Sequence, residues 1–205
     1  MTLRLKLAVL ATALGLAACS SPMMRYYTLV APLKTLPATK SQPAPFQFEM
    51  LAVQLPVQVD QPPLVVRQGD GSLAILDTER WGAPLGDEFH DALTAQLESR
   101  FGRRDVAGLP KDNSQPLLSL RTDVRRFESV AGDYALIDVV WNLGMRNGPT
   151  GSPRTNLTCS SVIREKAGPG LDNLVLAHQA AVARLADAIA HTATQWANRP
   201  AATCP

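Results

Sequence analysis

The chain has 205 residues, with 20 Lys or Arg against 18 Asp or Glu and a formal net charge of +2. Two of the basic residues, Arg4 and Lys6, lie within residues 1–18, so the 187 residues that follow carry no net charge. This balance gives no electrostatic reason to expect binding to nucleic acid or to an anionic surface. The length is sufficient for one domain with a substantial core.

Residues 1–18 have the pattern of a bacterial secretory signal peptide. The two basic residues precede an apolar run at residues 7–14, which is followed by small residues. A transmembrane helix needs about 20 apolar residues, and this run is about half as long. We therefore expect residues 1–18 to be removed from the mature protein.

The residues around the expected cleavage site match the lipobox of bacterial lipoproteins, LAAC at residues 16–19. Cleavage before Cys19 would leave its thiol and amine to carry acyl chains, and several such chains anchor a protein firmly in a membrane. The next residue is Ser20, whereas Asp at this position retains a lipoprotein in the inner membrane. The sequence therefore predicts attachment to the outer membrane, on its periplasmic face.

With cleavage at this site, we expect the chain to consist of three segments: a signal peptide (1–18), a lipidated tether (19–25) and a single domain (26–205). The six residues between Cys19 and the first expected strand span at most about 20 Å. We therefore expect the domain to lie close to the membrane.

The chain has two further cysteines besides the expected lipidation site, Cys159 and Cys204. Because the periplasm is oxidising, the simplest interpretation is a disulfide between them, and two free thiols are the alternative. No CxxC or HxxxH spacing accompanies them, so we do not expect a metal site.

The first half of the domain predicts two strands, a short hairpin and a helix. Aromatic and β-branched residues predict strands at 26–30 and 46–55, separated by a proline-rich loop at 32–45. Residues 64–67 and 73–76 flank a glycine turn and predict a short hairpin. Leu85, Phe89, Leu93, Leu97 and Phe101 recur every four residues and predict a helix over 84–101.

The second half predicts three consecutive antiparallel strands and a long helix. The strands cover 117–125, 135–145 and 155–166, and both faces of the second are partly apolar, so we place it centrally. An apolar stripe between 171 and 196 predicts an amphipathic helix. The order of elements favours an α/β sandwich of two or three layers, with one mixed, largely antiparallel sheet and two main helices.

The sequence offers no group of residues that would carry an enzymatic reaction. His178 lies on the apolar stripe, where a core or interface histidine is favoured over a catalytic one, and His191 lies off that stripe. His90 stands beside Asp91, but adjacent helix residues point in different directions, so we interpret them as part of a charged helix face. No nucleophile elbow, zinc-binding helix or phosphate loop is present. We predict no catalytic residue, no cofactor and no metal.

Three motifs nevertheless resemble those of a known family. They are YYTL at 26–29, VQLP at 53–56 followed by DQPPLVVR at 60–67, and ERWGAPL at 79–85. Together with the lipobox they resemble the ABC-type transport auxiliary lipoproteins of the PqiC or YmbA-like type. The Arg-Trp-x-x-Pro-Leu element is the most specific part, and the C-terminal half matches only in pattern.

The resemblance implies a fold and a role. The fold would be an anticodon-binding-like or TolB-N-like α/β layer with a five-stranded mixed sheet. The role would be to assist an MCE-type periplasmic protein and its ABC transporter, which move lipids or other hydrophobic compounds between membranes. We expect the lipoprotein to dock the end of such an assembly at the outer membrane. A homo-oligomer is compatible with the sequence.

Two alternatives stay open for the motif residues and for the function. Trp81 either packs against the first helix, with Arg80 pairing locally, or both lie in a partner interface, where Trp and Arg are enriched. Asp60 and Arg67 are expected to stabilise the proline turn. The rival functions are a direct lipid carrier and, with less support, an enzyme acting on envelope material.

Overall fold

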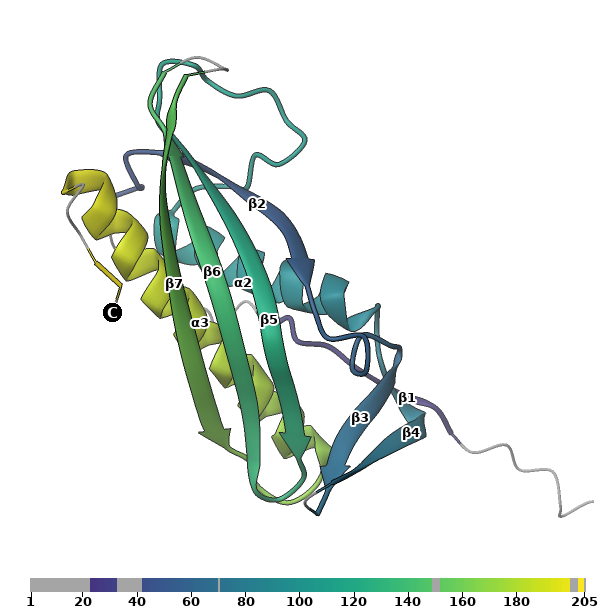
Figure 1. Cartoon of the computed structure of the whole chain (residues 1–205). Helices are drawn as coiled ribbons and strands as arrows, with labels where there is room; N and C mark the ends of the chain where they lie inside the picture. Colours follow the sequence, from purple (N-terminus) through teal and green to yellow (C-terminus); the bar gives the residue numbers. More distant parts are fainter. Residues whose placement is uncertain (1–22, 33–41, 70, 149–151, 200–202, 205) are drawn as a thin grey trace, which may run out of the picture.

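The computed structural model of the chain describes residues 23–32, 42–69, 71–148, 152–199 and 203–204 (Figure 1). The predicted signal peptide and Cys19 lie outside these residues. Within these residues the elements are, in chain order, β1 (Arg25–Tyr27), β2 (Gln47–Gln54), β3 (Pro63–Gln68), β4 (Ser72–Trp81), α2 (Leu85–Phe101), β5 (Leu117–Val130), β6 (Tyr134–Arg146), β7 (Arg154–Lys166) and α3 (Leu171–Asn198).

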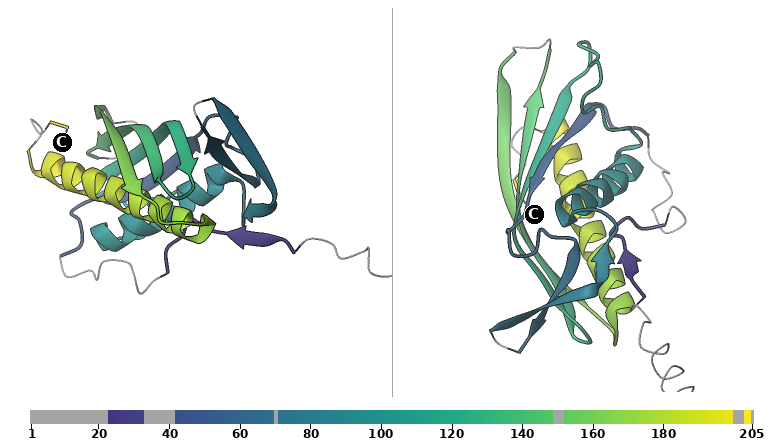
Figure 2. Two further views of the ribbon diagram at one scale, coloured as in Figure 1. Left: turned by 90° about the horizontal axis from the view of Figure 1, so that it is seen from below. Right: turned by 90° about the vertical axis from the view of Figure 1, so that its right-hand side faces the viewer.

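The strands form two mixed sheets, so the prediction of one five-stranded sheet is wrong. The main sheet has four strands in the order β2-β5-β6-β7, with β2 parallel to β5 and the other pairs antiparallel. The small sheet has three strands in the order β1-β4-β3, with β1 parallel to β4. Figure 2 shows the small sheet turned away from the main one at one end of the molecule.

Prolines and the length of β5 explain why the sheets separate. β2 pairs with β5 only as far as Asp123, so the second half of β5 has no β2 partner. The chain leaves β2 through a turn at Pro56, whose carbonyl accepts from Val59 N at 3.0 Å. β3 then begins at Pro63, and proline has no N–H to donate to a neighbouring strand. The β3–β4 hairpin therefore lies beside β5 without joining its hydrogen-bond ladder.

Both helices cover the same face of the main sheet, so the body of the domain has two layers (Figure 2). The five helix residues that predicted α2 are all buried. The apolar stripe predicted for α3 is buried as well, from Leu174 through His178 to Trp196. The central strand β6 is also as predicted, with alternate side chains from Ala135 to Met145 buried beneath the helices. The helix and strand periodicities in the sequence therefore predicted the main core correctly.

The first strand is shorter than predicted. β1 ends at Tyr27, and Leu29 lies buried beyond it instead of continuing the strand. The backbone here is bound by a side chain of α2, as described below. Much of the predicted loop at 32–45 lies outside the described residues.

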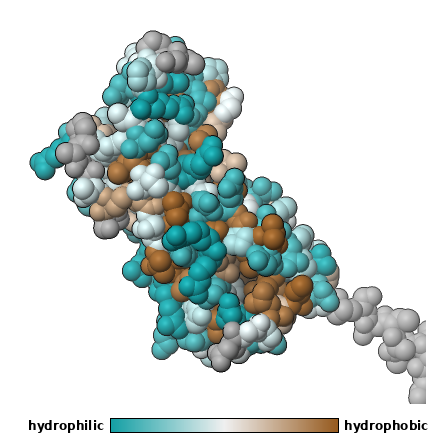
Figure 3. Space-filling model, in the orientation of Figure 1, coloured by the Kyte–Doolittle hydropathy of each residue, from teal (hydrophilic) through white to brown (hydrophobic). Residues whose placement is uncertain are grey.

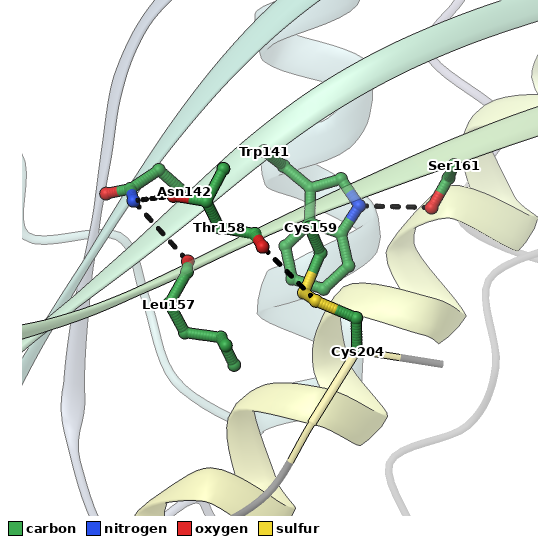
Figure 4. The surroundings of a disulfide bond; sticks show 7 residues. All are labelled: Trp141, Asn142, Leu157, Thr158, Cys159, Ser161 and Cys204. Carbon is green, nitrogen blue, oxygen red and sulfur yellow. Dashed lines mark hydrogen bonds between the residues drawn. A yellow bond between two sulfur atoms is a disulfide. The ribbon is translucent and has the colours of Figure 1, made fainter.

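The disulfide predicted between Cys159 and Cys204 is present (Figure 4). Cys159 is buried on β7 beside Trp141, its register partner on β6. Cys204 follows α3, so the bond joins the chain beyond this helix to the edge strand of the main sheet. Its sulfur also lies 3.2 Å from the carbonyl oxygen of Thr158. The disulfide therefore closes a loop that contains all of α3.

No helix of the described ranges is long and apolar enough to span a bilayer.

Replacing both cysteines, Cys159→Ala with Cys204→Ala, is expected to lower the free energy of unfolding by about 2–4 kcal/mol, because the unfolded chain regains the entropy of an open loop. Urea denaturation of the oxidised protein measures this change. A thiol reductant should destabilise the wild type by a similar amount and leave the variant unchanged. Equal stability of the oxidised wild type and the variant would contradict this role.

Candidate functional site at the start of helix α2

The three family-like motifs meet at one place, where β1, the proline turn and the end of β4 surround the first turn of α2. Tyr27 pairs in parallel register with Trp81. The carbonyl of Tyr27 accepts from Gly82 N at 2.8 Å, and the carbonyl of Pro62 accepts from Trp81 N at 2.8 Å. We call this the α2 junction; it comprises residues 27–29, 60–62, 79–82 and 86–88.

A buried carboxylate, Glu88, lies at the centre of the α2 junction. Its side chain accepts hydrogen bonds from Thr28 Oγ1 at 2.7 Å and from Leu29 N at 2.8 Å. Glu88 is 7% exposed and belongs to the first turn of α2, where the helix dipole favours a negative charge. A Cβ on Gly82 would lie only 3.0 Å from Glu88 Oε1, so a larger residue here would force the carboxylate to shift. Glu88 thus binds the segment after β1 to the helix.

Asp60 caps α2 from the proline turn. The helix begins after Pro84, which provides no side-chain cap, and Asp60 Oδ1 accepts from Gly86 N at 3.0 Å instead. The predicted role of Asp60 in its own turn therefore extends to the start of a helix 26 residues away. Arg67 is also not confined to its turn, because it forms a 3.0 Å ion pair with Glu128 of β5 and links the two sheets.

Trp81 lies in the core. It is 4% exposed and makes an edge-to-face contact with Phe127 of β5, with ring centroids 6.2 Å apart. Arg80 donates from Nε to the carbonyl of Asp77 at 3.1 Å. These contacts support the packing alternative for Trp81 and local pairing for Arg80. A role of the two residues in partner binding stays a prediction.

The face that β4 turns to the core changes along the strand. Ala74 and Leu76 pack against buried residues, and the next core residue of the strand is Trp81. Residues an odd number of positions apart lie on opposite faces of a regular strand, and Trp81 is an odd number of positions from both. The register between β3 and β4 is irregular between Pro63 and Leu64 and shifts at this point. Strict alternation from the hairpin would therefore place Trp81 on the wrong face.

The segment that leads from the predicted tether is also bound to α3. Arg25 forms a 2.8 Å ion pair with Asp172 in the first turn of α3, and Gln179 Nε2 donates to the carbonyl of Thr28 at 2.9 Å. Burial raises the pKa of the Tyr27 phenol, and the carboxylates of Glu79 and Asp172 raise it further. The first strand is thus held on two sides, close to the point where the tether enters.

His178 is a core residue, as predicted. Its imidazole stacks on Phe127 with ring centroids 4.1 Å apart, and Nε2 lies 2.8 Å from Ser129 Oγ. Complete burial lowers the pKa of His178 to about 3, so the ring is neutral at the pH of the periplasm.

The other histidines lie on the surface. His90 Nδ1 is 3.1 Å from Asp91 Oδ1, so these neighbours do contact each other, contrary to the expectation from helix geometry. Both are part of an exposed helix face, and His191 is exposed as predicted. In the described part of the chain, no three His, Cys, Asp or Glu side chains are placed to hold a metal ion.

Two hollows with mainly apolar walls lie on the surface of the described structure. One, of about 200 Å³, lies between the proline turn, β3 and β5. The other, of about 240 Å³, lies near Phe46, Met145 and Trp196. Both are smaller than the roughly 300–1,000 Å³ of small-molecule sites. A third hollow, of about 510 Å³, is lined mainly by polar groups that include Arg67 and Arg126.

Comparison with known proteins identifies one protein family. The family model described as "ABC-type transport auxiliary lipoprotein component" matches residues 27–190. This match spans the α2 junction, the whole main sheet and most of α3. A search of curated proteins found no match.

Solved structures share the fold. An uncharacterized protein has a TM-score of 0.64 and 19% identity, with 83% of this chain and 98% of that chain covered. Protein XCC0632 from Xanthomonas campestris has a TM-score of 0.59 and 14% identity, with 87% of this chain and 98% of that chain covered. At these identities the likeness shows the fold alone.

Glu88→Ala is expected to loosen the segment after β1, because the backbone N–H of Leu29 would lose its buried acceptor, at a cost of roughly 1–3 kcal/mol. Hydrogen–deuterium exchange measured on peptides that cover residues 26–30 should become at least about tenfold faster, which corresponds to 1.4 kcal/mol. Asp87→Ala is the matched control, since Asp87 is an exposed carboxylate in the same turn. Equal exchange in the two variants would show that Glu88 does not hold this segment.

The buried histidine predicts a pH-dependent stability. Because the folded pKa of His178 is about 3, below its ordinary value of 6.5, the unfolded chain binds more protons between these values. The free energy of unfolding should therefore fall as the pH is lowered, by roughly 1.5 kcal/mol between pH 6.5 and 5.

Urea denaturation across this pH range compares the wild type with His178→Gln and with His191→Gln. The His178→Gln variant should lose most of the dependence, whereas His191→Gln, which changes an exposed ring, should keep it. A wild-type stability that is flat from pH 6.5 to 5 would exclude a neutral buried His178.

Proposed function

The chain belongs to the ABC-type transport auxiliary lipoprotein component family, and from this premise we propose that it is an outer-membrane lipoprotein that docks a periplasmic MCE-type assembly at that membrane. Membership makes it an auxiliary lipoprotein of an ABC-type transport system and implies a non-catalytic role. The outer membrane, the lipid on Cys19 and the MCE-type partner are the proposed refinements.

The observation that carries the proposal is the fixed start of the domain. Arg25, at the beginning of β1, is bound to α3, and Thr28 and Leu29 are bound to Glu88. Only five residues, 20–24, separate Cys19 from this fixed strand, so its lipid would hold the domain within about 20 Å of the bilayer. A domain held in this way cannot cross the periplasm, and an assembly from the inner membrane has to reach it.

The lipid-carrier alternative has less support. A carrier needs an apolar cavity that covers most of its ligand, and ligand sites of this kind measure about 300–1,000 Å³. The two hollows with mainly apolar walls described above are about 200 and 240 Å³. They suit one or two side chains of another protein better than an acyl chain.

Two variants test the membrane assignment. In growing cells, the wild type is expected to incorporate labelled palmitate and to fractionate with outer membranes. Cys19→Ser should lose the label and the membrane attachment, whereas Ser20→Asp should keep the label and remain with inner membranes. Fractionation of Ser20→Asp with outer membranes, or a label that survives Cys19→Ser, would refute the assignment.

Docking itself is tested by isolating the full-length tagged lipoprotein from detergent-solubilised envelopes after mild crosslinking. The MCE-type component of the cell should co-isolate with the wild type, and its yield should fall at least fivefold with Cys19→Ser, which detaches the domain from the membrane. Native mass spectrometry of the same preparation distinguishes the rival, because a carrier retains bound lipid and a docking protein does not. Bound lipid without the MCE-type component would favour the carrier.

A further inference from the structure

An exposed apolar surface lies where the β3–β4 hairpin meets the proline turn. Leu73 and Ile75 of β4 are 50% and 53% exposed, and Val57 of the turn is 85% exposed. Val65 of β3 pairs with Ile75 and so lies on the same face of the hairpin, but it is itself buried, at 8% exposed. Figure 3 shows brown, hydrophobic atoms gathered at the lower right of the molecule, where Figure 1 draws β3 and β4. We call these four residues the hairpin patch.

The hairpin patch borders the hollow of about 200 Å³ between the two sheets. Val65 and Leu73 line one side of this hollow, and Phe127 of β5 lines another. The residues on either side of Val57, Pro56 and Gln58, belong to the lining as well. The surface therefore combines protruding aliphatic side chains with a recess large enough for one or two side chains of another molecule.

Arg125 and Arg126 of β5 also line the same hollow. β5 has an irregular register between Val124 and Arg126, and as a result both Arg125 and Arg126 are exposed. Their ion-pair partners, Asp138 and Glu128, have side chains only 15% and 11% exposed, whereas the two arginines are 50% and 54% exposed. The cationic groups are thus the outermost charges beside an apolar centre, an arrangement typical of protein-binding surfaces.

We propose that the hairpin patch and its hollow bind a protein segment that inserts one or two apolar side chains and brings carboxylates against Arg125 and Arg126. The inference rests on the proposed function, since the partner it expects is a periplasmic component of the transport system. The volume of the hollow is too small for a phospholipid acyl chain as a main ligand. Two copies of the domain meeting patch to patch would set arginines against arginines, which disfavours a symmetric self-contact.

Site-specific photocrosslinking in cells tests this surface on the full-length lipoprotein. A benzophenone amino acid is introduced at Ile75 or at Val57, and at Leu176 as the control. Leu176 is 58% exposed but lies on α3. Adducts are identified by mass spectrometry. The patch positions should yield an adduct with a periplasmic component of the transport system at least fivefold above the yield from Leu176.

Charge and apolar variants then show which groups the contact uses. Arg125→Gln with Arg126→Gln should lower the adduct yield from Val57 at least fivefold, and Ile75→Asp should do the same. The matched controls are Arg184→Gln, an exposed arginine that pairs with Glu165, and Leu176→Asp, and both should leave the yield unchanged. Thermal unfolding of each variant confirms that the comparison is made between folded proteins.

Three outcomes would overturn the inference: an adduct yield no greater than from Leu176, an adduct with a second copy of the chain, or an adduct with lipid alone. The failure of the proposed function looks different. If the transport component co-isolates with the wild type but does not crosslink to the patch, docking stands and uses another surface. If the component does not co-isolate with the wild type at all, the docking function itself fails.

Discussion

The architecture of this domain depends on one buried carboxylate. Glu88 is removed from water, which is costly for a charged group unless hydrogen bonds compensate it. Two of these bonds come from the segment that follows β1, and the dipole of α2 supports the charge from the other side. The same helix terminus receives Asp60 from the proline turn. Two distant parts of the chain, the segment after β1 and the proline turn, therefore depend on the first turn of α2 for their relative positions.

The long helix α3 connects the two ends of the domain. Its first turn holds Arg25 through Asp172, next to the entry of the tether, and the chain beyond its last turn is joined to β7 by the disulfide. With 28 residues, the helix is about 42 Å long. The segment that follows the predicted tether is thus tied to the main sheet by one helix. The β3–β4 hairpin of the small sheet presents the exposed side chains of Leu73 and Ile75 to the surroundings, which suits a binding surface on a firm support.

Much of the fold was predictable because the signals are local. The spacing of four residues in α2 and the alternation along β6 each report a buried face directly, and both predictions hold in the structure. Sheet membership was not predictable in this way. Whether β4 joins β5 or turns away depends on the prolines before β3 and on how far β2 runs along β5, and both are effects of distant pairing. Alternation on β4 and β5 also fails beyond their irregular registers, because each shifts the phase of the side chains that follow.

The candidate site also has features that local sequence predicts and features that depend on distant parts of the chain. By itself, the sequence predicted the lipid attachment at Cys19, and it determined the pairing of Cys159 with Cys204 and the motifs that identify the family, since each depends on residue types at short spacing or on a count of cysteines. Only the tertiary structure decided what those motifs do. It buries Trp81 against Phe127 and gathers the motifs around Glu88, a residue that no motif contains. It also exposes Leu73 and Ile75, which the sequence shows only as half of a hairpin. The reason is physical: burial depends on which distant elements cover a side chain, and a single stretch of sequence does not contain that information.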